Sequence, residues 1–213
     1  MELALSFLSS LIYWALTIYE WIVILAILLS WVNPDPRNPI VMFLNNMTVP
    51  FWNWLRGHLP LQLRLFAPYI SLLVIWFFRI FAPGSVRSLS SFVGGRIALG
   101  SLGVQVLGHS LLGIGIVFQN FLYFLIILLL IWFFLTLVSP SVGNPIVRTI
   151  YFLVDPFITP LQRRLPRTRI DISPLIVAAL FFVVSAFVVS ALLDFANGLA
   201  GYSLPRDLAR PVY

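Results

Sequence analysis

The apolar run over residues 175–193 most constrains the fold of this chain, because it contains no charged side chain. A helix of that length is long enough to cross the roughly 30 Å hydrocarbon core of a membrane. A segment rich in arginine and proline precedes it, with the sequence Arg163-Arg164-Leu165-Pro166-Arg167-Thr168-Arg169-Ile170-Asp171-Ile172-Ser173-Pro174. We call residues 163–174 the basic segment, and we expect it to lie just outside the membrane.

The end of the basic segment carries signals for the start of a helix. Ser173 is predicted to cap the helix, with its hydroxyl oxygen accepting from amides of the first turn. Pro174 suits the first helical position because it has no N–H to leave unpaired. Asp171 places negative charge near the positive end of the helix dipole.

An earlier part of the chain repeats this pattern. Asn38-Pro39-Ile40-Val41 matches Asn144-Pro145-Ile146-Val147 at an offset of 106 residues (144 − 38). The same ungapped offset superposes several prolines, namely Pro34 on Pro140, Pro50 on Pro156, Pro60 on Pro166 and Pro68 on Pro174. We interpret this as an internal duplication. The first copy is degenerate, since Leu65 stands where Asp171 does and Ala67 replaces Ser173.

Composition indicates a polytopic membrane protein. The chain is 61% hydrophobic and 9% charged, whereas soluble domains carry about 25% charged residues. Its net charge of +6 comes from arginine without lysine, which suits membrane topology and anionic lipid headgroups better than direct nucleic-acid binding. The absence of cysteine excludes disulfides, thiol catalysis and cysteine-ligated metals in this chain.

The remaining segments give an all-α architecture of two tandem two-helix repeats, each with an interfacial amphipathic helix. Membrane helices are expected at residues 11–32, 66–82, 112–138 and 175–193. Residues 33–64 should lie in the interface, and residues 144–161 form an amphipathic helix capped by Asn144, with Ile146, Ile150, Leu153 and Phe157 as its apolar stripe. The predicted units are a first repeat (10–82), a Gly/Ser-rich linker helix (83–111), a second repeat (112–194) and a polar tail (195–213).

The linker helix is predicted to lie along the far membrane surface or to dip into it. Ser90, Gly94, Ala98 and Ser101 form a small-residue stripe at helical spacing, which allows close helix packing within or between chains. Arginine is concentrated in the two interfacial segments, so these segments are expected on the cytoplasmic side. If residues 86–108 crossed the membrane instead, the chain would span it five times and the two copies would be inverted.

The second copy carries motifs that resemble the YggT family of bacterial inner membranes and plastids. These motifs are Asp155-Pro156 followed by Pro160-Leu161, Arg163-Arg164-Leu165-Pro166 and Ile170-Asp171-Ile172-Ser173-Pro174. The resemblance covers about residues 10–193, although the first copy keeps mainly the prolines. It implies a multi-pass protein of the bacterial inner membrane. Relatives are linked to biogenesis of membrane complexes and cofactor attachment, to nucleoid or division-site organisation, and to osmotic tolerance.

Glu20 is the most unusual single residue, since an acid near mid-membrane is costly and usually has a partner or marks an ion path. Glu20 lies roughly 18 Å before the end of the first helix and Arg79 roughly 20 Å beyond the start of the second, at 1.5 Å per residue. The two residues can therefore meet at equal depth in an antiparallel hairpin. A structural ion pair is the preferred interpretation, and a proton or cation site is the alternative.

The basic segment also allows two interpretations. Arg163, Arg164, Arg167 and Arg169 can set topology and bind anionic headgroups, or they can dock another membrane protein, or a second copy of the chain, beside the amphipathic helix.

Nothing in the sequence predicts catalysis, a cofactor, a metal site or a small-molecule substrate. His58 and His109 are expected near opposite membrane faces, which disfavours a shared metal. The preferred function is therefore a non-enzymatic accessory, assembly or scaffold protein. The alternative is a small channel or transporter in osmotic or cation balance, for which Glu20, Gln119 and Asn120 are the available polar groups.

Overall fold

A computed structural model describes residues 2–32, 34–138, 144–163 and 171–201 of the chain. Regular structure in these ranges is entirely helical. Four helical stretches are long and apolar enough to span a membrane: α1 (Glu2–Val32), η1 (Leu61–Phe66) with α3 (Ala67–Val93), α4 (Leu99–Val138), and α6 (Ser173–Val184) continued by the π-helical turn η2 (Ser185–Val189) and α7 (Ser190–Leu199). The predicted all-α membrane fold is confirmed, and the described residues contain no fifth span.

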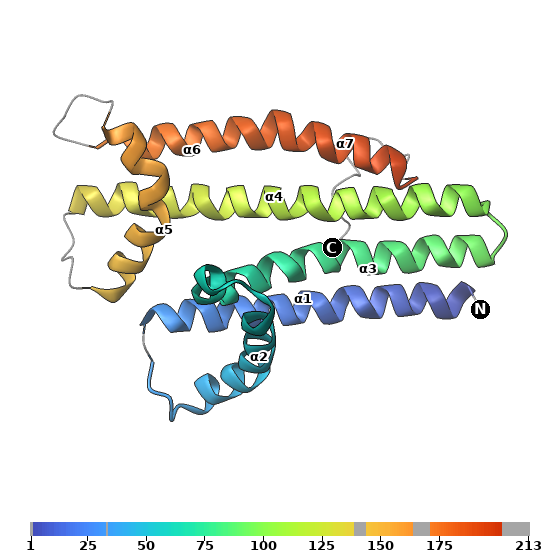
Figure 1. Ribbon diagram of the computed structural model, residues 1–213, viewed down its shortest axis with the longest axis horizontal. Coiled ribbons are helices and arrows are strands. Elements are labelled where there is room, and N and C mark those ends of the chain that lie inside the picture. Colours follow the sequence, from blue (N-terminus) through green and yellow to red (C-terminus); the bar gives the residue numbers. More distant parts are fainter. Residues whose placement is uncertain (1, 33, 139–143, 164–170, 202–213) are drawn as a thin grey trace.

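The four spans form a single layer. Figure 1 shows them side by side in the order α1, α3, α4 and α6–α7, and each helix contacts its neighbour in this row. Two shorter helices, α2 (Pro39–His58) and α5 (Pro145–Gln162), cross the spans at the same end of the layer, opposite the N-terminus (Figure 1). A head-to-tail duplication of a two-span unit requires this common side, because each unit returns the chain to the face where it began.

The duplication is visible in the buried faces of the two crossing helices. On α2 the buried residues include Val41, Leu44, Thr48 and Trp52, and on α5 they are Val147, Ile150, Val154 and Ile158. Each member of one set lies 106 positions from its counterpart. Both helices also begin alike, since the side chains of Asn38 and Asn144 accept from the amides of Ile40 and Ile146 at 2.9 Å.

The apolar stripe predicted for α5 is only partly correct. Ile150 is buried, but Ile146 is exposed, and Leu153 and Phe157 are only partly buried. Val154 instead is completely buried. The apolar surface of this helix is broader than one stripe, so packing against the spans decided which edge of it became buried.

The prediction of a separate linker helix over residues 83–111 is wrong. Residues up to Val93 continue α3, and residues from Leu99 onwards begin α4. The chain turns at Gly94 and Gly95, where Gly95 has a φ of 69° that favours glycine. The turn separates Ser90 and Gly94 from Ala98 and Ser101, so the predicted small-residue stripe does not form. Glycines that approach a neighbouring element lie at Gly84, Gly108, Gly113 and Gly115 instead.

The spans are also longer than their apolar cores suggested. α1 begins at Glu2 rather than near residue 11, and α7 ends at Leu199, inside the predicted polar tail. Ser6 and Ser10 bond to carbonyls of the preceding turn, which lets polar residues extend α1 without unpaired hydroxyls.

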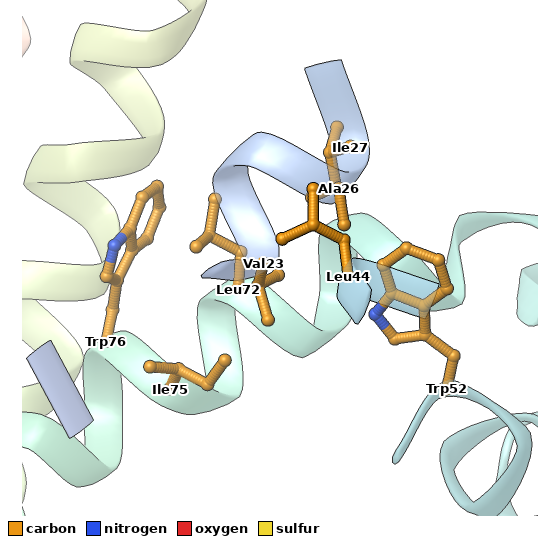
Figure 2. Close-up of a cluster of buried hydrophobic side chains, with 8 residues drawn as sticks. All are labelled: Val23, Ala26, Ile27, Leu44, Trp52, Leu72, Ile75 and Trp76. Carbon is orange, nitrogen blue, oxygen red and sulfur yellow. The ribbon is translucent and has the colours of Figure 1, made fainter. Parts of the chain in front are cut away.

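Each repeat packs its crossing helix against its own pair of spans. In the first repeat, Val23 of α1, Leu44 and Trp52 of α2, and Leu72 and Trp76 of α3 belong to one buried cluster (Figure 2). Leu129, Val154 and Val177 are among the corresponding members of a cluster formed by α4, α5 and α6 in the second repeat.

Candidate functional site

The structure places Glu20 and Arg79 in contact, as their matched depths predict. The Arg79 guanidinium donates to the Glu20 carboxylate, and Glu20 is only 8% exposed. Sequence reasoning missed a third member: Trp76 donates from Nε1 to Oε1 of Glu20 at 2.8 Å. Trp76 and Arg79 are three residues apart on α3, a spacing that puts both on one helix face. The arrangement gives a buried carboxylate two donors, one of them charged.

Two buried polar atoms near this part of the hairpin have no hydrogen-bond partner within the described residues. They are Nε of Arg79 and the hydroxyl of Tyr13. Tyr13 lies seven residues before Glu20, about two turns, and therefore on the same face of α1. The α1–α3 interface thus keeps some unused donor capacity beside the ion pair.

More polar contacts join α1 to α3 towards the N-terminus. Ser9 donates to the carbonyl of Pro83 at 2.9 Å and accepts from Nε of Arg87 at 3.1 Å. Glu2 also pairs at 2.6 Å with Arg96, which lies in the turn after α3 and is more exposed. Polar contacts therefore recur along much of the first hairpin.

The second hairpin lacks the ion pair. The positions 106 residues after Glu20, Trp76 and Arg79 are Ile126, Phe182 and Ser185. Ser185 is buried, its hydroxyl has no partner in the described part of the chain, and it begins the π-helical turn η2. The two repeats share a fold but not this site.

The start of α6 is held by Asp171 rather than by Ser173, which corrects the predicted cap. Asp171 Oδ1 accepts from the amide of Ser173 at 2.9 Å, and Oδ2 accepts from Nε2 of Gln162 at 2.5 Å. Ser173 is buried inside the first turn, one residue too far along the chain to cap it. Gln162, at the end of α5, was not anticipated from sequence and links the two helices.

The ionisation of Asp171 reflects these contacts. Burial of its carboxyl group raises the pKa, but hydrogen bonds from Ser173 and Gln162 outweigh this effect and hold the pKa below its ordinary value. The carboxylate is therefore the form that joins α5 to α6.

A family model described as CCB3/YggT matches the chain twice, over residues 5–86 and 111–192. The chain belongs to the CCB3/YggT family. The two matches begin 106 residues apart (111 − 5) and end 106 residues apart (192 − 86), which is the offset found within the sequence. No curated protein and no solved structure matches the chain at a significant level.

Several residues of the predicted family motif lie on α5 and in the first turn of α6. Asp155 accepts from the hydroxyl of Thr159 at 2.6 Å. Asp155 also raises the pKa of Tyr151, by hydrogen bonding and by its negative charge. Pro156 and Pro160 are exposed within α5, whereas Pro174 is fully buried in the first turn of α6.

The arginines of the basic segment are only partly covered by the structure. Arg163 is exposed at the end of α5. Arg164, Pro166, Arg167 and Arg169 lie outside the described residues, so their predicted roles stay predictions.

The two histidines of this CCB3/YggT chain lie apart. His58 is exposed on α2, with Nδ1 at 2.8 Å from the carbonyl oxygen of Trp54. His109 is buried on α4, with Nε2 at 3.0 Å from the hydroxyl of Ser88 on α3. The described residues contain no group of three histidine, cysteine or acidic side chains that could hold a metal.

Proposed function

We propose that this protein is a non-enzymatic membrane accessory protein that supports the assembly or organisation of other membrane protein complexes. One observation carries the proposal: Glu20, the acid near mid-span, is paired with Arg79 and Trp76, while apolar side chains cover the outside of the four spans. Polar groups used inside the hairpin serve its own cohesion. The apolar exterior is left for lipid and for other membrane helices.

The end of the layer that carries α2 and α5 is the proposed docking side. The outer face of α2 exposes large apolar side chains, among them Ile40, Phe43, Met47 and Trp54. Arg163 is exposed at the end of α5, where the basic segment begins. Such a surface suits anionic lipid headgroups together with an integral membrane partner. From the arginine distribution, we place this side on the cytoplasmic face of a bacterial inner membrane.

Co-purification in mild detergent tests the proposal. The natural chain should recover a defined set of membrane proteins after cross-linking in cells. Replacing Arg163, Arg164 and Arg167 together by glutamine should remove members of that set. The matched control is Arg96→Gln, at the opposite end of the layer. An unchanged set of partners, with altered sensitivity to anionic lipid, would reduce the basic segment to a lipid contact.

A second candidate function, a small channel or transporter, is favoured by one observation. The unpaired Arg79 Nε and Tyr13 hydroxyl lie on the same hairpin as Glu20. Against it, Gln119 bonds only weakly within its own helix, to Tyr123 at 3.5 Å, and lines no described path. Ion flux across the membrane of liposomes that contain the purified protein distinguishes a channel or transporter from an assembly protein. Flux that disappears in Glu20→Ala would establish the channel and displace the assembly role.

A further inference from the structure

The two repeats contact each other through one helix face from each repeat. At each end of the row, one of these two kinds of face has no neighbouring helix within the described chain. Within the chain, α3 of the first repeat packs against α4 of the second. Because the repeats are equivalent, α6–α7 presents the counterpart of this α3 face, and α1 presents the counterpart of this α4 face. Both lie at the outer edges of the row (Figure 1). Repeat proteins bury such faces by adding another unit.

The contact between α3 and α4 shows which positions form these two faces. Gly113 of α4 lies so close to Phe77 of α3 that a Cβ at Gly113 would approach the Phe77 ring to 2.8 Å. One turn further along α4, Val117 packs against the buried cluster that α1, α2 and α3 form. Gly113 and Val117 are four residues apart and therefore lie on one face of α4.

The equivalent positions at the row's edges are open. The counterparts of Gly113 and Val117 on α1 are Phe7 and Leu11, which are 70% and 51% exposed. On α6, the counterpart of Phe77 is Val183, which is 49% exposed. Side chains that are covered between the repeats are therefore uncovered at both ends.

Side-chain sizes at these positions are complementary. Inside the chain the large residue, Phe77, is on α3 and the small one, Gly113, is on α4. At the edges the large residue, Phe7, is on α1 and the smaller one, Val183, is on α6. The larger side chain is on the α3-type helix inside the chain but on the α4-type helix at the edges. A contact between the edges would therefore again pair a large side chain with a smaller one. Packing of this kind drives association of membrane helices, since lipid removes the hydrophobic driving force.

The crossing helices point to the same arrangement. α5 reaches back from the second repeat to contact α1, and the ring of Phe152 stacks on Phe66 with centroids 6.2 Å apart. Among the described elements, α2 contacts only α1, α3 and η1, all in its own repeat. Its outward Met47, the counterpart of the partly buried Leu153, is 43% exposed. A preceding unit would give α2 the neighbour that α5 already has.

We propose that a second copy of this chain continues the row, with the α1 edge of one copy packed against the α6–α7 edge of the next. The two surfaces differ, so the contact is head-to-tail rather than two-fold symmetric. Such contacts generate rings or open arrays instead of stopping at a dimer. All copies keep α2 and α5 on one side of the membrane, which would extend the proposed docking surface along the array.

Disulfide cross-linking tests the arrangement cleanly, because the natural chain has no cysteine. Two differently tagged copies, one with Phe7→Cys and one with Val183→Cys, are expressed together, and the membranes are oxidised. The mixed disulfide should dominate over both symmetric products. A single chain that carries both changes should give a ladder of trimers and larger species.

The matched control is Leu8→Cys in place of Phe7→Cys. Leu8 is also exposed, but its counterpart Ile114 stays exposed on α4, so Leu8 points away from the row. Leu8→Cys should lose most of the mixed product with Val183→Cys at equal membrane accumulation. Disulfides formed mainly between two Phe7→Cys copies would overturn the head-to-tail contact in favour of a symmetric dimer. No disulfide in any combination would mean that lipid covers both edges, and this would also overturn the proposal. Neither outcome bears on partner co-purification, which tests the proposed function separately.

Discussion

The indole Nε1 of Trp76 lies 2.8 Å from Oε1 of Glu20, so a tryptophan on α3 holds the same carboxylate that Arg79 binds. The carboxylate therefore keeps a neutral donor in addition to a charged one inside the apolar hairpin. Hydrogen bonds to a charged group are stronger than those between neutral groups. The pair with its tryptophan joins α1 to α3 at a buried position.

Breaking the ion pair from either side should destabilise the hairpin. Glu20→Gln and Arg79→Leu should each lower membrane accumulation, because each leaves the partner's charge buried and unpaired, at a cost of about 3–5 kcal/mol. The double change should restore part of the loss. Quantitative immunoblotting of membranes measures this, with Glu2→Gln as a control at the exposed pair with Arg96. Additive losses in the double variant would contradict direct pairing.

Removing only the indole donor should have a smaller effect. Trp76→Phe keeps an aromatic ring but leaves one oxygen of Glu20 without its N–H, at an expected cost of about 1.5–3 kcal/mol. The thermal unfolding midpoint in detergent should fall. Trp54→Phe, at an exposed position on α2, should leave the midpoint nearly unchanged. Equal shifts for the two variants would mean that the hydrogen bond contributes nothing specific.

The approach of α3 to α4 should be sensitive at Gly84. A Cβ added there would lie 2.6 Å from the His109 ring, so Gly84→Ala should cost about 1–3 kcal/mol through overpacking. Gly103→Ala is the control, since open space surrounds Gly103 on α4 and alanine favours a helix. Thermal unfolding should separate the two. Gly84→Ala should cost less in a His109→Ala background than in the natural chain, and an equal cost in both backgrounds would point to another cause.

The link between α5 and α6 should weaken in acid. The pKa of Asp171 is lowered in the folded protein, so its stabilising contribution is present above the unfolded pKa and is lost as pH falls through the folded pKa. Hydrogen-exchange protection at the start of α6, measured relative to the intrinsic exchange rate at each pH, should therefore decrease as pH falls below about 4, the ordinary pKa of an aspartate.

Two variants separate the charge of Asp171 from its capping role. Asp171→Asn keeps an oxygen acceptor for the Ser173 amide, so most of the protection should remain at pH 7 and its acid dependence should disappear. Asp171→Ala should lose the cap at every pH, at about 1 kcal/mol. If acid sensitivity persisted in Asp171→Asn, another group would be responsible.

Features that depend on local pattern were predictable from the chain. Apolar runs marked the four spans, and the 106-residue offset between Asn38 and Asn144 marked the repeat that the family matches reproduce. The Glu20–Arg79 contact was predicted from their matched depths, because an antiparallel hairpin brings residues of equal depth to one level and a buried acid needs a partner.

Other features depend on contacts between segments that are distant in sequence. Residues 83–111 divide between α3 and α4 because the turn formed at Gly95, although their small residues also suit a separate helix. Asp171 rather than Ser173 caps α6, since the end of α5 brings Gln162 within reach of the same carboxylate. Trp76 joined the ion pair because α3 turns that face, among several apolar faces, towards α1. Hydrophobicity sets how many helices enter the membrane, whereas side-chain packing sets their rotation and neighbours, and only the assembled layer specifies that packing.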